Sequence, residues 1–198
     1  MPGLTTRSAT IARRTRETAI ELSLSLDGSG TADIATGIGF YDHLLTALAF
    51  HARLDLSLRC TGDLEVDDHH TVEDCALALG QAIDTALGER AGIRRFGSAC
   101  APLDEALARA VVDCSGRPFA RVALDLRRDT IGALACENIT HALQSLATAA
   151  RITLHVDMLA GENDHHRAEA AFKAVALALR EAVTQAGEGV PSTKGTLT

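Results

Sequence analysis

Two stretches of the chain, residues 67–73 (DDHHTVE) and residues 163–169 (NDHHRAE), contain the same hexad. In both, an Asp precedes two adjacent histidines, and a Glu follows three positions after the second histidine. A single histidine on an apolar face is usually a packed core residue, but two identical hexads in one chain indicate a shared chemical role. Their repetition also indicates that the chain consists of two related halves.

The repeat extends outward from the hexads. His43 begins a helical pattern that recurs at His141, and alternating residues 53–58 recur at 151–156, both at an offset of 98. Apolar positions after the hexads match at an offset of 96. The pattern predicts a disordered tail at 1–8, a first half at 9–94, a second half at 95–187 and a C-terminal loop at 188–198. The two halves are expected to form a single integrated catalytic domain.

Each half combines two hydrophobic periods. Alternating residues predict strands at 20–26, 54–58, 108–112, 119–126 and 152–156. Apolar residues at helical spacing predict helices at 42–50, 71–87, 140–149 and 167–183. The expected fold class is α+β, with two pseudo-repeated halves that each form a mostly antiparallel sheet with helices packed on one face.

Composition excludes several classes of protein. The 198 residues are 46% hydrophobic and 23% charged, which is ordinary for a globular chain. A net charge of −7 argues against nucleic-acid binding through a cationic stripe, although local basic residues could hold one small phosphate. No apolar run approaches the length of a membrane span. The polar N-terminus does not resemble a secretory signal, and the five cysteines contain no CxxC pair. We therefore expect a cytoplasmic protein with reduced, mostly buried thiols.

The hexads have the chemistry of metal sites. His70 lies three residues before Glu73 and His69 lies four, so either pair can chelate one ion from a helix face. Adjacent histidines point about 100° apart on a helix, so they are expected to serve different ions. Imidazole and carboxylate together suit Mn, Fe, Co, Ni or Zn. The acidic residues that precede ligands, Asp42, Asp68 and Asp164, are expected mainly to cap helices, or to orient imidazoles.

The predicted ligand set comprises six histidines and two glutamates: His43, His69, His70, Glu73, His141, His165, His166 and Glu169. It divides into two ions with three histidines and one glutamate each. His51 and His155 have no counterpart in the other half and are expected not to bind metal. The spacing leaves open which ligand serves which ion.

Further motifs point to one family. They are residues 15–18, 37–43, 67–74, 78–82, 95–97, 113–118, 163–169 and 191–195. With these motifs, the sequence from about residue 13 to residue 195 resembles the imidazoleglycerol-phosphate dehydratases of histidine biosynthesis. Tyr41, where Phe is usual, and the residues around His141 depart from the family pattern.

The resemblance implies a site and an assembly. It implies two Mn(II) ions per active site and homo-oligomers of 24 subunits with active sites at subunit interfaces. It favours His43, His70, Glu73 and His166 on one ion, and His69, His141, His165 and Glu169 on the other. It also implies that Glu17 contacts the substrate and transfers protons, and that the substrate phosphate is bound by Arg95, Arg117, Ser192, Thr193 and Lys194.

The implied reaction is a dehydration. Imidazoleglycerol phosphate, a small-molecule phosphate, would lose water to give imidazoleacetol phosphate through an imidazolate intermediate that the metals stabilise. Two other functions share the ligands. A dinuclear hydrolase would normally use more bridging carboxylates, and a metal-storage protein would not need Glu17 or the basic residues.

Overall fold

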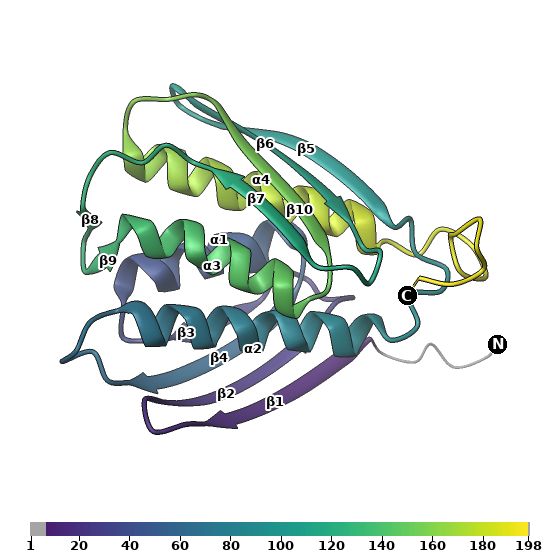
Figure 1. Cartoon of the computed structure of the whole chain (residues 1–198), viewed down its shortest axis with the longest axis horizontal. Helices are drawn as coiled ribbons and strands as arrows, with labels where there is room; N and C mark the ends of the chain where they lie inside the picture. The colour runs from purple at the N-terminus through teal and green to yellow at the C-terminus, as the bar shows by residue number, and fades with distance from the viewer. Residues whose placement is uncertain (1–6, 198) are drawn as a thin grey trace.

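The computed structural model describes residues 7–197 and has two four-stranded sheets with helices between them (Figure 1). The elements of the first half are β1 (Ser8–Arg14), β2 (Thr18–Ser25), β3 (Ala32–Ala35), α1 (Gly39–Ala52), β4 (Asp55–Gly62) and α2 (His69–Leu87). The second half contains β5 (Phe96–Leu103), β6 (Ala106–Asp113), β7 (Phe119–Ala123), β8 (Thr130–Ile131), β9 (Leu134–Ala135), α3 (Cys136–Ala149), β10 (Thr153–Ala160) and α4 (Asp164–Val183).

The two large sheets have the same topology. Their strand orders are β1-β2-β4-β3 and β5-β6-β10-β7, and in each the last strand is parallel to its neighbour while the other pairs are antiparallel. The β1–β2 hairpin has the register of β5–β6 when 88 is added to each residue number. The predicted fold class is confirmed, and β8–β9 forms an additional small hairpin before α3.

Each sheet buries one face against helices because its strands alternate. In β2, Ile20, Leu22 and Leu24 are buried while the residues between them face outward. The equivalent inward positions of β6 include Ala108 and Ala110, and α4 packs on this sheet with a row of buried alanines. Small side chains on both surfaces let the helix and the sheet approach closely.

The helices of the two halves pair with each other. α1 packs against α4, and α2 packs against α3. Each pair therefore joins one helix from each half in the layer between the sheets (Figure 1). This pairing of helices from different halves determines which predicted ligands lie close together.

The ends of the predicted elements shift. Ser8 opens β1 although the prediction placed it in the tail, and residues 1–6 lie outside the described residues. The predicted strand 119–126 ends at Ala123, because the backbone N–H groups of Arg127 and Arg128 turn to the Asp164 carboxylate.

The described chain has free cysteines and no spanning helix. All five cysteines are free; three are buried, Cys60 is partly buried and Cys100 is exposed. No helix within residues 7–197 is both long and apolar enough to cross a membrane.

Candidate metal centre

Both histidine pairs lie at helix N-termini. His69 opens α2, and its backbone N–H donates to Asp67 Oδ1 over 2.8 Å. In α4 the cap is Asn163, whose side chain accepts from the backbone N–H of His165 over 2.9 Å. These local hydrogen bonds satisfy free N–H groups of the first turn and fix where each pair starts.

The acidic residues before the ligands do not cap helices. Asp68 accepts from the Ala135 backbone over 2.7 Å and from Asn138 Nδ2 over 3.0 Å, and Asp42 accepts from the backbone and hydroxyl of Thr36. Asp164 accepts from two backbone N–H groups of the loop before β8. The capping prediction was wrong for Asp42 and Asp164, whose carboxylates tie loops to α1 and α4. Asp68 stands at the N-cap of α2 but makes no capping hydrogen bond there; it orients the His69 imidazole through Asn138, which was the alternative expectation.

One group of potential ligands joins α1 and α4. Glu169 Oε2 lies 2.8 Å from His43 Nε2 and 3.3 Å from His165 Nε2. The other oxygen of Glu169 receives an ion pair from Lys173 at 2.6 Å. Partial burial alone would raise the pKa of Glu169, but the hydrogen bonds from Lys173 and His43 outweigh it and lower the pKa to about 2. The carboxylate is therefore ionised and able to bind a cation.

The second group joins α2 and α3. His141 Nε2 lies 3.1 Å from Glu73 Oε1, and the His69 and His141 rings stack with centroids 5.0 Å apart. His69 Nδ1 donates to Asn138 Oδ1 over 3.0 Å, which leaves Nε2 available as a ligand atom. In each group the three ligand atoms lie within 4.8 Å of one another, close enough for a single ion.

The grouping within the chain differs from the predicted partition. His43 meets Glu169 rather than Glu73, and His141 meets Glu73 rather than Glu169. The cause is that each helix packs against a helix of the other half, which the repeat in the sequence does not reveal.

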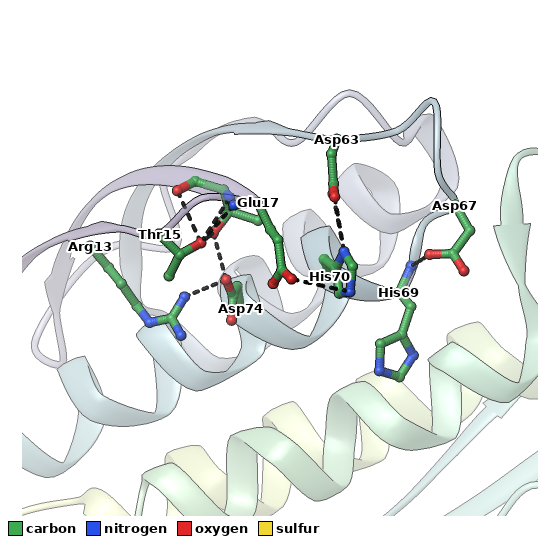
Figure 2. A network of polar contacts seen from close by, with 9 residues as sticks. Arg13, Thr15, Glu17, Asp63, Asp67, His69, His70 and Asp74 are labelled. Carbon is green, nitrogen blue, oxygen red and sulfur yellow. Dashed lines mark hydrogen bonds and ion pairs between the residues drawn. The ribbon is translucent and has the colours of Figure 1, made fainter.

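His70 and His166 belong to neither group within residues 7–197. The Nδ1 atom of His70 lies 3.0 Å from Asp63, and that of His166 lies 2.7 Å from Glu105. These hydrogen bonds raise the pKa of both histidines. Figure 2 shows Glu17 beside His70, with 3.7 Å between Glu17 Oε1 and His70 Nε2.

A model of the imidazoleglycerol-phosphate dehydratase family matches residues 36–179. The chain belongs to this family. Dehydratases of this family are carbon–oxygen lyases of histidine biosynthesis, and the chain is an enzyme of that class.

Curated dehydratases match nearly the whole chain. The protein of Phaffia rhodozyma is 57% identical over 201 residues, which cover 98% of each chain. That of Phytophthora nicotianae is 62% identical over 192 residues; these cover 96% of this chain but 42% of the longer relative.

Solved dehydratases share the fold. The structure from Staphylococcus aureus has a TM-score of 0.82 at 34% identity and covers 90% of this chain and 99% of that one. The structure from Pyrococcus furiosus has a TM-score of 0.81 at 38% identity and covers 94% and 100%.

The residues predicted to bind phosphate lie at the other end of this dehydratase chain. Arg95 donates from its backbone to the Ala182 carbonyl near the end of α4, whereas His165 lies in the first turn of that helix. At 1.5 Å per residue, the two points are about 25 Å apart along the helix. The phosphate residues and the ligand groups therefore do not converge within one chain.

The predicted phosphate residues gather around the C-terminal segment. Arg95 forms an ion pair with Asp113 at 2.8 Å and donates to the Pro191 carbonyl over 2.9 Å. Lys194 donates from its backbone to Ser192 Oγ over 3.2 Å, and the side chains of Thr193 and Lys194 are exposed. The Leu197 carbonyl lies against Gly116, next to Arg117, where a Cβ would come within 2.3 Å of it.

The sequence analysis missed four residues that support the ligands: Asp63, Glu105, Asn138 and Lys173. Lys173 follows Glu169 by four residues on one helix, so helical spacing would have found it. Asn138 of α3 bonds to His69 of α2, so only the packing of these two helices reveals its role. Glu105 corresponds to Glu17 at the offset of 88, which only the paired hairpins reveal. His51 and His155 lie outside both ligand groups; that they bind no metal stays a prediction.

Proposed function

We propose that the chain converts imidazoleglycerol phosphate to imidazoleacetol phosphate and water at a site with two Mn(II) ions. The observation that supports this most directly is the presence of two matched groups, each with two histidines and one glutamate within 4.8 Å. Nitrogen and carboxylate oxygen donors without thiolate suit Mn(II) and its neighbours in the first row.

One further histidine per group would complete three histidines and one glutamate for each ion. His70 and His166 remain for this role, since each has Nδ1 occupied by a carboxylate and Nε2 free of one within 3.5 Å. Because neither joins a group in its own described chain, we assign them to ions bound by neighbouring copies. The proposal keeps all eight predicted ligands and revises only their partition.

The bound ions would act as Lewis acids that favour the imidazolate form of the substrate ring. An imidazolate can expel hydroxide from the ring-adjacent carbon, which makes the proton on the next carbon acidic. Glu17 would remove this proton, and the resulting enol would become the ketone. Half of the Glu17 side chain is exposed at the start of α2, where a substrate can reach it.

The phosphate would be bound by the C-terminal segment of a neighbouring copy. Arg117, Ser192, Thr193 and Lys194 supply charged and polar donors, and Arg95 is oriented by Asp113. Since these residues lie about 25 Å from the ligands of their own chain, a complete site requires subunit contacts. We accordingly propose a homo-oligomer of 24 subunits with interfacial sites, located in the cytoplasm, where free cysteines are stable.

An assay with the full chain tests this function. The metal-free protein is reconstituted with Mn(II) and supplied with imidazoleglycerol phosphate, and the ketone product is measured. We expect turnover that depends on Mn(II). Metal binding without turnover would favour a storage protein, whereas release of inorganic phosphate instead of ketone would favour a hydrolase.

A further inference from the structure

The hairpin tips of the two halves carry equivalent glutamates. The identical registers of β1–β2 and β5–β6 place Glu17 and Glu105 at the same position, directly before the second strand of each hairpin. Each lies beside the second histidine of its half: Glu17 beside His70 and Glu105 beside His166. Both halves thus place a glutamate and a histidine side by side at equivalent positions, but the contacts between them differ.

In the second half, the tip glutamate holds the histidine. Glu105 Oε2 lies 2.7 Å from His166 Nδ1. Its other oxygen accepts from the backbone N–H groups of Asn163 at 2.9 Å and Glu162 at 3.2 Å. Glu105 is therefore fixed by the loop that leads into α4.

In the first half, another carboxylate holds the histidine. Asp63 Oδ2 lies 3.0 Å from His70 Nδ1, and the backbone N–H of Asp63 donates to the Glu17 carbonyl over 3.1 Å. Figure 2 shows Asp63 and Glu17 on different sides of the His70 ring. Since Asp63 occupies Nδ1, the Glu17 carboxylate is left facing Nε2 at 3.7 Å, beyond hydrogen-bond distance.

The turn that carries Glu17 is fixed independently of its carboxylate. Thr15 Oγ1 accepts from the backbone N–H groups of Glu17 at 3.1 Å and Thr18 at 2.9 Å. The Thr18 hydroxyl donates to the buried Asp74 of α2 over 2.5 Å. Figure 2 shows Arg13 paired with the same carboxylate. The backbone of Glu17 is thus anchored by hydrogen bonds, while its half-exposed carboxylate contacts His70 Nε2 at 3.7 Å.

The second half places its carboxylate differently. β10 has an irregularity between Met158 and Ala160, so Gly161 takes the position of Gly62: a Cβ on Gly161 would meet Arg167 and Ala106, as one on Gly62 would meet Thr71 and Thr18. Glu162 therefore takes the position of Asp63, and its backbone N–H donates to Glu105 Oε1 over 3.2 Å. The carboxylate at His166 Nδ1 comes from Glu105.

We propose that Asp63 and Glu105 are positioning residues, which keep the proton of His70 and His166 on Nδ1 and present Nε2 as the ligand atom. A carboxylate can only accept from a neutral ring nitrogen that carries the proton, so each contact selects one tautomer. Because Asp63 accepts from His70, the Glu17 carboxylate is left available for proton transfer. The Glu105 carboxylate, in contrast, accepts from His166. The roles of the metal and of Glu17 rest on the proposed function, whereas the proposed tautomer of His70 and His166 does not.

The tautomer is tested without metal. Ring nitrogen shifts are measured by NMR on the full chain with ¹⁵N-labelled histidine, stripped of metal at pH 8.5, with His70→Gln and His166→Gln variants to assign the signals. We expect the proton on Nδ1 in both rings. Asp63→Leu should abolish this preference at His70 alone, and Glu105→Met at His166 alone. A proton on Nε2 in the parent chain would overturn the proposal, whether or not the chain is a dehydratase.

Metal affinity provides the second readout. In Mn(II) titrations, Asp63→Leu and Glu105→Met should each weaken binding by about 10- to 100-fold. Asp63→Asn and Glu105→Gln keep an amide oxygen that accepts from Nδ1, so they should recover part of the loss. The matched control is Glu65→Gln, an exposed carboxylate of the loop after β4, which should bind like the parent. Unchanged affinity in both apolar variants would contradict the positioning role, whereas a parent chain that binds no Mn(II) would contradict the proposed function instead.

Discussion

Glu17 is the carboxylate that the first half leaves free, and its removal should affect chemistry alone. Glu17→Gln preserves the shape of the side chain but cannot accept the substrate proton. We expect turnover to fall by about 10²- to 10⁴-fold with Mn(II) content unchanged, measured by steady-state kinetics and elemental analysis. Glu21→Gln, on the outer face of β2, is the matched control and should retain full turnover. Full turnover in Glu17→Gln would mean that another group transfers the proton.

A second carboxylate, Asp55, stabilises the fold away from the site. Asp55 Oδ1 accepts from the backbone N–H groups of Ser29, Gly30 and Thr31 at 2.8 to 3.1 Å. These hydrogen bonds, led by that from Thr31, lower the pKa of Asp55 below its ordinary value of 3.8. A lowered pKa in the folded state means that the stabilisation is present above this ordinary value and is lost as the pH falls through the lowered one.

Asp55→Ala should therefore lower the free energy of unfolding by about 1 to 3 kcal/mol near pH 7. The difference from the parent should narrow below pH 3.8. Urea denaturation of the metal-free chain, near pH 7 and below pH 3.8, measures this difference in unfolding free energy. Asp33→Ala, which removes an exposed ion pair with Arg59, should cost at most about 1 kcal/mol. If the difference in unfolding free energy between Asp55→Ala and the parent did not change with pH, the ionised Asp55 carboxylate could not be the source of the stabilisation.

At the scale of elements, the contact of α2 with α3 depends on Gly80. A Cβ at this position would lie 2.5 Å from the Leu146 carbonyl oxygen and 2.7 Å from Ala149 Cβ. Gly80→Ala should force α2 away from α3 and lower the free energy of unfolding by about 1 to 3 kcal/mol, despite the higher helix propensity of Ala. Because α2 carries Glu73 and α3 carries His141, Mn(II) binding should weaken as well.

Thermal unfolding and Mn(II) titration of this variant measure the two effects. Gly39→Ala is the matched control, since Gly39 opens α1 and a Cβ there meets nothing within 4 Å. If Gly80→Ala unfolds at the same temperature as the parent and binds Mn(II) with the same affinity, the helix pair can repack without moving the ligands.

Prediction from sequence succeeded where periodicity is strong. The four long helices were placed correctly, but each extends further toward the N-terminus than predicted: α2 begins at His69 instead of 71, and α4 at Asp164 instead of 167. The short strands β3, β8 and β9 were missed because two to four residues carry too little alternation. The longer β1 and β5 were also missed; both are edge strands with few buried side chains. The histidines and glutamates of the hexads were found from helix spacing, whereas the meeting of His43 with Glu169 depends on packing between halves, which no local pattern encodes.

At the scale of the whole molecule, the ligands and the phosphate residues occupy opposite ends of the helical layer. On the proposed function, a complete site would need at least two copies, and His70 and His166 would complete ions bound by neighbouring copies. Metal that binds only to the assembled state stabilises that state by mass action. Assembly and metal content should therefore change together.

Chelation tests this coupling directly. Complete removal of metal, confirmed by elemental analysis, should convert the particle to smaller oligomers in analytical ultracentrifugation, and Mn(II) should restore its size. The His70→Gln/His166→Gln double variant keeps both three-residue groups but should remain small at Mn(II) concentrations that rebuild the parent. The His51→Gln/His155→Gln double variant removes the same number of imidazoles outside the groups and should assemble normally. A particle of unchanged size without metal would mean that protein contacts alone hold the copies together, and that the ions serve only the reaction.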